Sequence, residues 1–247
     1  MPRQMIQTDP EAYRLCDEIQ VIEDLVEVNG HQVLELGCGA AWMTRLLATR
    51  LGARRVTATE VDRIQHQKNL AIQDLPRVEF RVGGAESIAD ADATYEGVFL
   101  FKSLHHVPVD LMDRALAEIQ RVLVPGGYVY LSEPVYWGAL NEVMRLIHDE
   151  CLVRTAAYEA IERAVASGRF TWERQVFYQS EGVYLNWDAF AERFIQVTHT
   201  DHDLDAVRLA EIRAAFERHL TPEGARFLKP HRVDLLRVKS EVTAAPA

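Results

Sequence analysis

The sequence has little of what marks several large classes of protein. Its 247 residues contain three cysteines, Cys16, Cys38 and Cys151. This odd, scattered set argues against a disulfide framework or a zinc knuckle. No apolar run approaches the ~20 residues of a membrane-spanning helix, and the N-terminal stretch lacks the apolar segment of a signal peptide. We therefore expect a cytoplasmic protein with no role for a membrane.

Positive charge is also scarce. Lys and Arg number 27 against 37 Asp and Glu, which gives a formal net charge of −10 at pH 7. No basic run is longer than Arg54-Arg55, and an acidic surface repels the phosphate backbone of nucleic acids. We expect a small-molecule partner and no nucleic acid, and the sequence leaves the oligomeric state open.

The chain does contain a regular alternation of strand and helix patterns. Five short apolar strand patterns are separated by helical ones, at QVLEL, RRVTATEV, RVEFRVG, GVFLFK and YVYLSEP. Such alternation with short links predicts an α/β fold in which helices cover both faces of a parallel sheet. Ligands of such sheets bind outside the carboxyl ends of the strands.

The alternation predicts a core with additions. We expect the N-terminal segment, residues 1–30, to contain a helix over 10–28 that closes the pocket. The predicted core spans 31–137 and the cap spans 138–187. The remaining core strands, with a helical insertion, span 188–240, and a flexible tail spans 241–247. Within the cap, 139–168 predicts one long helix or two short ones, and 170–187 a hairpin or an irregular flap. Residues 194–200 predict a further strand.

One strand-to-helix turn is rich in glycine: HQVLELGCGAAWMTRLLA, residues 31–48. Glycines there let the backbone approach a ligand closely. A dinucleotide fingerprint needs G-x-G-x-x-G, but Trp42 stands where the third glycine would be. Glu35, at the strand end, would repel a pyrophosphate and suits an ammonium group.

Two further carboxylates follow the next strands. Glu60 ends the second strand, where an acid can hold ribose hydroxyls. Glu86, in GGAES after the third strand, or the neighbouring amides could read an adenine edge. Together the features indicate a ligand with ribose, adenine and a cationic amino-acid end but no phosphate. S-adenosyl-L-methionine fits that description.

The segments VLELGCG, VTATEVD, GGAES, FKSLHHV and EIQRVLVPGGYVYLSEP resemble those of class I S-adenosylmethionine-dependent methyltransferases. The resemblance covers about residues 31–135. It implies a doubly wound, mostly parallel seven-stranded sheet with the last strand antiparallel and a helical cap. One departure is Ala41, where the family often has a third glycine.

The resemblance also implies roles for individual residues. At the methionine end of the cofactor it places Glu35, Gly37, Cys38 and Gly39, with the backbone of Lys102 and Ser103. At the ribose it places Glu60, and around the adenine Val61 or Asp62, Ala85 and Glu86.

The residues of the transfer step are less constrained, because positioning supplies most of the catalysis. His105 and His106 follow the fourth strand and are candidate general bases. Glu133, Tyr136 and Trp137 follow the fifth strand and are candidate acceptor-binding residues, although packing explains them equally well.

THTDHDLD, residues 198–205, contains two histidines and three aspartates. An acidic loop that caps a helix explains this stretch, so we expect no metal.

The predicted function is methyl transfer from S-adenosylmethionine to O, N or C of a small molecule, by in-line displacement and with a histidine as a possible base. The alternatives are a nicotinamide-dependent oxidoreductase on a Rossmann core and a non-catalytic S-adenosylmethionine binder. A nucleic-acid methyltransferase is disfavoured by the charge and by the lack of an NPPY-like tetrapeptide. The sequence does not identify the acceptor.

Overall fold

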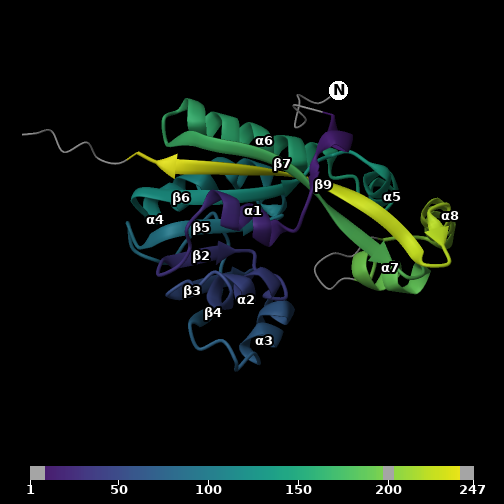
Figure 1. Cartoon of the computed structure of the whole chain (residues 1–247), viewed down its shortest axis with the longest axis horizontal. Helices are drawn as coiled ribbons and strands as arrows, with labels where there is room; N and C mark the ends of the chain where they lie inside the picture. The colour runs from purple at the N-terminus through teal and green to yellow at the C-terminus, as the bar shows by residue number, and fades with distance from the viewer. Residues whose placement is uncertain (1–8, 197–202, 240–247) are drawn as a thin grey trace, which may run out of the picture.

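A single mixed sheet runs through the molecule (Figure 1). The computed structural model describes residues 9–196 and 203–239. Its longer strands are β2 (Gln32–Leu36), β3 (Arg55–Glu60), β4 (Val78–Val82), β5 (Tyr95–Phe101), β6 (Leu123–Pro134), β7 (Phe170–Tyr184) and β9 (Gly224–Val238). The two-residue strands β1 (Arg14–Leu15) and β8 (Leu220–Thr221) extend the sheet at β7 and β9.

The strand order is β1-β7-β9-β6-β5-β2-β3-β4. β4, β3, β2, β5 and β6 pair in parallel, whereas β9 is antiparallel to both β6 and β7. The seven longer strands confirm the predicted α/β sheet with an antiparallel last strand. The chain adds β3 and β4 on one side of β2, and β5 and β6 on the other. The order therefore reverses between β2 and β5, where open sheets of this kind bind ligands.

Helices cover both faces of the sheet. They are α1 (Glu18–Leu25), α2 (Trp42–Thr49), α3 (Arg63–Leu70), α4 (Met112–Val122), α5 (Ala139–Ile147), α6 (Cys151–Ala166), α7 (Trp187–Phe194) and α8 (Ala206–Glu217). α1 and α2 bury Ile22 and Leu47 against one face, and α4 and α6 bury Ile119 and Ile161 against the other. The central strands are apolar on both sides because both faces are covered.

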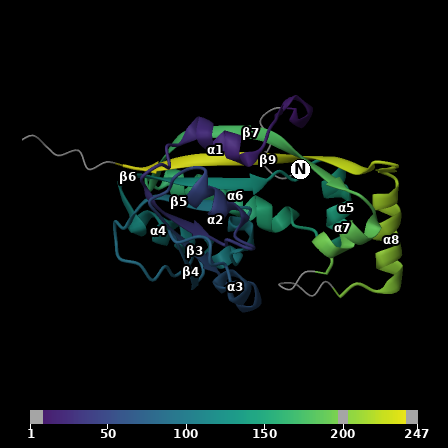
Figure 2. The same ribbon diagram turned by 60° about the horizontal axis from the view of Figure 1, so that its bottom comes forward.

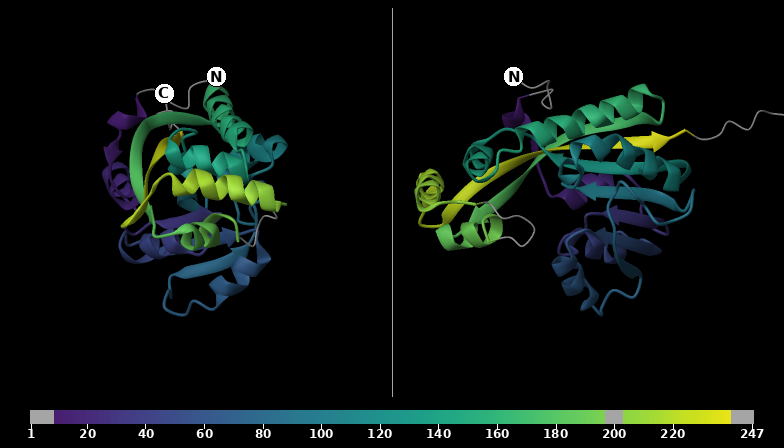
Figure 3. Two further views of the ribbon diagram at one scale, coloured as in Figure 1. Left: turned by 90° about the vertical axis from the view of Figure 1, so that its right-hand side faces the viewer. Right: turned by 180° about the vertical axis from the view of Figure 1, so that it is seen from behind.

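The far ends of β7 and β9 project past the main sheet as a two-stranded ribbon (Figure 2). We call this ribbon, residues 180–184 and 224–229, together with α5, α7 and α8 the outer lobe. The lobe has its own core, in which Phe190, Phe216 and Phe227 pack together. Figure 3 shows it beyond the carboxyl ends of β5 and β6.

The predicted N-terminal helix over 10–28 is wrong in its length. A 3₁₀ turn, η1 (Pro10–Ala12), and β1 precede α1, and the helix itself begins only at Glu18. Asp17 caps α1 in a reciprocal arrangement with Gln20. The apolar residues before Asp17 instead support the pairing of β1 with β7, since the Tyr13 ring packs against the Phe177 ring.

The segment expected to be a cap is divided between two places. Residues 139–168 form two helices: α5 belongs to the outer lobe, and α6 packs on the main sheet. Residues 170–184 are one continuous strand, neither hairpin nor flap, because they pair along their whole length with β9. That partner lies about fifty residues later in the chain, so no local pattern could reveal it.

The strand predicted over 194–200 is also wrong in the part that lies within the described residues, 194–196. Phe194 ends α7, and Ile195 and Gln196 are not in a strand. The remainder, with most of the histidine and aspartate stretch and the predicted tail, lies outside the described residues. Within the described ranges, no helix has both the length and the apolar content to cross a bilayer.

Candidate cofactor and acceptor site

The glycine turn lies at the reversal point between β2 and β5. Gly37 has φ +76°, which is the left-handed region. A Cβ on Gly37 would lie 2.8 Å from the Ser103 hydroxyl oxygen and 2.9 Å from Ser103 Cβ. The Ser103 hydroxyl itself donates to the Gly37 carbonyl at 3.3 Å. The structure therefore brings together Gly37 and Ser103, two predicted site residues 66 positions apart.

Glu35 is buried beneath the start of α2. Its side chain accepts a hydrogen bond from the Thr44 hydroxyl at 2.6 Å, and the residue is 1% exposed. Burial raises the pKa of Glu35 to about 8, outweighing the Thr44 bond. The carboxyl is therefore mostly protonated at neutral pH, and a cationic group brought next to it would favour ionisation.

Glu60 links the first two loops. One carboxylate oxygen accepts from the Gly39 amide at 2.8 Å and the other from the Asp62 amide at 2.9 Å. A carboxylate has about four acceptor positions, so two remain for a ligand's hydroxyl groups. This arrangement agrees with the predicted ribose contact, which stays a prediction.

Cys38 contributes its backbone to the turn. The Gly37 and Cys38 amides both donate to the Thr59 carbonyl, at 3.0 and 2.9 Å. Burial raises the pKa of the Cys38 thiol well above its ordinary value, so the sulfur is not a nucleophile. Asn69 on α3 donates to the Gly39 carbonyl at 2.7 Å. Sequence reasoning missed Asn69 because nothing in the α3 pattern distinguishes it from surface amides.

The predicted adenine residues differ in their surroundings. Val61 is 66% exposed beside the turn. Asp62 caps α3 by accepting from the Ile64 and Gln65 amides. Ala85 is buried in the core under α4, and half-buried Glu86 turns its carboxylate back over Gly84. Their contacts with adenine remain predictions.

Lys102 directly follows β5 in a left-handed conformation with φ +58°. Its ammonium donates to Glu18 at the start of α1, at 2.5 Å. Burial alone would raise the pKa of Glu18, but Lys102 and His231 lower it to about 2. The ion pair therefore ties α1 to the carboxyl end of β5. Sequence reasoning assigned only backbone contacts to Lys102 and missed Glu18.

The two candidate bases lie side by side in a 3₁₀ turn, η2 (Leu104–His106), with ring centroids 4.2 Å apart. His105 is buried, and its Nδ1 is bonded to the Glu133 carboxylate. Glu133 also accepts from the Leu104 amide at 2.9 Å. Burial would raise the pKa of Glu133, but His105 more than offsets this and lowers it. His106 is exposed.

The three predicted acceptor-binding residues lie in different surroundings. Glu133 is 3% exposed and bonded to His105, and its contact with an acceptor stays a prediction. Tyr136 is half-buried and donates to Asp149 at 2.9 Å. Trp137 is also half-buried, in the connection to α5. Tyr136 and Trp137 keep their predicted roles as predictions.

One group in the described part of the chain has metal-ligand chemistry. Ligand atoms of His105, His106 and Glu150 all lie within 4.8 Å of one another. However, Arg154 donates to Glu150 through Nη2 at 2.5 Å, which places a fixed cation against the carboxylate. We therefore read the group as a polar network without a metal role.

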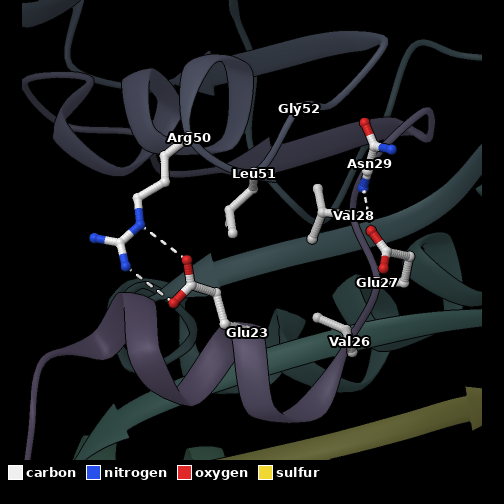
Figure 4. Close-up of a pocket in the computed structure, with 8 residues that line it drawn as sticks. All are labelled: Glu23, Val26, Glu27, Val28, Asn29, Arg50, Leu51 and Gly52. Atoms are coloured by element: carbon white, nitrogen blue, oxygen red, sulfur yellow. Dashed lines mark hydrogen bonds and ion pairs between the residues drawn. The ribbon is translucent and has the colours of Figure 1, made fainter.

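A hollow of about 260 Å³ lies at the opposite edge of the sheet, near the amino ends of β2 and β3; Figure 4 shows the residues that line it. Its lining comes from the end of α1, the link to β2 and the end of α2, and Arg50 bridges to Glu23 at 2.8 and 3.0 Å. None of the predicted site residues lines it.

Comparisons with known proteins agree with this geometry. Residues 33–127 match the sequence model of a methyltransferase domain. YcgJ of Bacillus subtilis, a solved structure 16% identical in sequence, superposes with a TM-score of 0.62 over 90% of this chain and 98% of that one. Residues 33–127 thus match a methyltransferase domain. The predicted fold is confirmed, the match supports the predicted family, and S-adenosyl-L-methionine is the cofactor that such a domain implies.

Curated relatives match about half of this chain. Methyltransferase GfsG of Streptomyces halstedii is 29% identical over 146 residues, which are 56% of this chain and 50% of the relative. The 2-phytyl-1,4-naphtoquinone methyltransferase of Thermosynechococcus vestitus is 35% identical over 112 residues, 44% of this chain and 48% of the relative. The chain thus spans about half the length of these relatives.

Proposed function

We propose that this chain transfers a methyl group from S-adenosyl-L-methionine to a small-molecule acceptor. The observation that carries the proposal is the turn at the reversal point, where Gly37 touches Ser103 and two carboxylates, Glu35 and Glu60, converge. The matched relatives support a small acceptor, since one is named for a naphthoquinone substrate.

The residues of the turn suit each part of this cofactor. The backbone of residues 37–39 and the Glu35 carboxyl would hold its amino-acid end, and the free acceptor positions of Glu60 its ribose hydroxyls. When bound, the cofactor supplies a methyl group already activated on a sulfonium sulfur. The protein then has to align the acceptor and exclude water, and such positioning is worth ~7–11 kcal/mol.

We assign the base role to His106. His105 contacts its ring, and Glu133 in turn orients His105. An acceptor can reach His106 because it is exposed, whereas His105 is buried. Glu133 fixes the orientation of His105, and the two imidazole rings are in contact. A base is needed only for an acceptor atom that loses a proton.

His106→Gln tests this assignment. We expect turnover to fall by ~10²–10⁴-fold, the usual contribution of a general base. Cofactor affinity should stay within about twofold, since the substitution keeps the backbone bond from residue 106 to the Ser103 carbonyl. Full turnover in the variant would remove His106 from the base role.

We also propose a cytoplasmic location and a small-molecule partner. The three cysteines are unpaired, which fits the reducing cytoplasm. The net charge of −10 favours a small molecule over nucleic acid. The nicotinamide alternative is disfavoured because Trp42, at the third glycine position, is 76% exposed at the start of α2.

Two measurements test the central proposal. Calorimetric titration with S-adenosylmethionine should show binding below ~1 mM, the weak end of ordinary affinities. No heat of binding at that concentration would contradict the cofactor assignment. Release of S-adenosylhomocysteine with a metabolite mixture should then distinguish an enzyme from a non-catalytic binder.

A further inference from the structure

Glu150 lies beside the two histidines of η2. Its carboxylate and the rings of His105 and His106 each offer one atom, and these atoms all lie within 4.8 Å of one another. Glu150 directly precedes α6, which packs against η2. β6 packs against the same turn and supplies Glu133, which is bonded to His105. The histidine pair therefore has a carboxylate within reach from each of two elements.

The Glu150 carboxylate is held in place from the α6 side. Arg154, one turn along the helix, donates to its Oε2 through Nε at 3.0 Å and through Nη2 at 2.5 Å. The Nη1 of Arg154 donates to the side-chain oxygen of Asn141 on α5 at 3.2 Å. The side chains of Glu150 and Arg154 are only 20% and 12% exposed. These contacts connect the outer lobe, through α5, to the histidine pair.

The bonds from Arg154 leave part of the Glu150 carboxylate for another donor. Both bonds end on Oε2, whereas a carboxylate has about four acceptor positions over its two oxygens. A ring nitrogen of His106 is among the atoms that lie within 4.8 Å of this carboxylate. The histidine is exposed, so an acceptor can approach it while the carboxylate holds it from the protein side.

The surroundings favour a charged Glu150. Burial alone would raise its pKa, but Arg154 and the two histidines more than offset this and lower it. Within the described part of the chain, the charged side chains that α6 and β6 bring to the histidine pair are Glu150 and Arg154 from α6 and Glu133 from β6. An ionised carboxylate beside an imidazole favours the protonated ring.

We propose that Glu150 is the positioning residue of His106, which holds the imidazole ring in one orientation and stabilises the imidazolium formed during transfer. The acceptor atom gives its proton to a ring nitrogen of His106 and keeps the electron pair for its new bond to the methyl carbon. The sulfonium sulfur keeps the pair of the bond that breaks. A carboxylate that orients a basic imidazole and stabilises its cation serves the same purpose in hydrolytic triads. This inference rests on the proposed function, since it concerns the base assigned there.

The first experiment follows the His106 ring itself and needs no acceptor. Protein with isotope-labelled histidine is titrated by NMR from about pH 5 to about pH 9, and His106→Gln identifies the resonance. In Glu150→Gln we expect the midpoint of the His106 titration to fall by about one pH unit, because the imidazolium loses the neighbouring carboxylate. An unchanged midpoint would overturn the proposal.

The matched control is Glu162→Gln. It makes the same change about 18 Å further along α6, at the usual rise per residue. At about 0.15 M salt such a distant charge is screened, so the His106 midpoint should stay as in the wild type. Glu150→Asp keeps the negative charge and should restore at least part of the shift. Equal shifts in Glu150→Gln and Glu162→Gln would contradict a local role for Glu150.

The second experiment measures turnover against pH. In the wild type, kcat should fall below the His106 midpoint, since only the neutral ring accepts a proton. In Glu150→Gln this fall should move to lower pH by the same amount. The plateau kcat should drop by about three- to tenfold because the imidazolium is less stable, while the KM for S-adenosylmethionine stays within about twofold. A lower kcat with an unmoved pH profile would indicate a merely structural role and would overturn the proposal.

The two experiments separate this inference from the proposed function. Failure of S-adenosylmethionine to bind would contradict the proposed function, whereas the NMR titration is done without cofactor and would still test the contact. Full turnover by His106→Gln would remove the base role, and with it the role of Glu150. An unchanged His106 midpoint in Glu150→Gln, with impaired turnover by His106→Gln, would contradict the role of Glu150 alone.

Discussion

The carboxyl ends of β2, β3 and β5 differ from the region where β6, β7 and β9 pair in how their charged side chains are satisfied. At the first edge, Glu60 accepts from two backbone amides and Glu35 from the Thr44 hydroxyl. Where β6, β7 and β9 pair, the buried charges are satisfied by other side chains, as Glu133 is by His105 and Asp234 by Arg232. The first edge therefore keeps acceptor positions on Glu60 for a ligand, whereas the second depends on contacts between its own side chains.

The same contrast holds below the surface. Under α6, Arg232 donates to Asp234 at 2.6 Å, and Gln175 donates to the same carboxylate at 2.7 Å. The Arg232 guanidinium lies 4.3 Å from the Tyr158 ring centroid. All these contacts join β7, β9 and α6. The comparison teaches that a cofactor can be held by local loops, while the acceptor edge depends on elements brought together from distant parts of the chain.

The largest expected effect concerns the acceptor edge. Asp234→Leu leaves the guanidinium of Arg232, 1% exposed, without its carboxylate. We expect the free energy of unfolding to fall by ~3–5 kcal/mol, as measured by urea denaturation. The control is the double variant Arg232→Met/Asp234→Leu, which should recover most of the loss. If the single variant is as stable as the wild type, the acceptor edge does not depend on this pair.

The next effect separates the two glycines of the turn. Gly37→Ala should lower cofactor affinity by at least about a hundredfold, since its Cβ adds a clash with Ser103 to the ~1–2 kcal/mol of a left-handed residue. Gly39→Ala is the matched control, because a Cβ there has nothing within 4 Å. Calorimetry should rank the two variants in this order. Equal losses would show that the approach of the turn to β5 is unimportant.

A smaller effect tests the link between the first two loops. Glu60→Ala should weaken cofactor binding by ~1.5–3 kcal/mol, because hydrogen bonds to a charged group are lost. Unchanged cofactor affinity would make the ribose assignment wrong.

The smallest effect is a proton linkage at Glu35. Its pKa of about 8 in the empty protein lies above the ordinary value of 4.5, so folding favours the protonated form. The resulting stability is complete below about pH 4.5 and is lost as the pH rises towards 8.

A bound ammonium group would favour the carboxylate form of Glu35. We therefore expect cofactor binding at pH 7 to release close to one proton, detected by calorimetry in two buffers of different ionisation enthalpy. Glu35→Gln should release none. Equal proton release by both proteins would assign the linkage to another group.

The sequence was sufficient for most of the cofactor edge. QVLEL followed by GCG predicts a buried strand, a close backbone turn and a helix, and all three occur. Glu60 was recognisable because it ends a strand next to that turn. The role of Glu133 was not recognisable, because its contact with His105 depends on the pairing of β5 with β6.

The acceptor edge was less accessible. The aromatic and β-branched residues over 170–184 fit several local structures, and their pairing with β9 decided among them. The position of β9 between β6 and β7 is likewise not revealed by its own residues.

The sequence by itself determined the parallel core, the glycine turn and the kind of cofactor, because these depend on residue spacing within single strand–turn–helix units. The tertiary structure alone decided which histidine is buried and which carboxylate orients it. These features arise from strand pairings and helix packing between residues far apart in the chain. Such contacts follow from the free energy of the whole fold and leave no periodic pattern in the sequence.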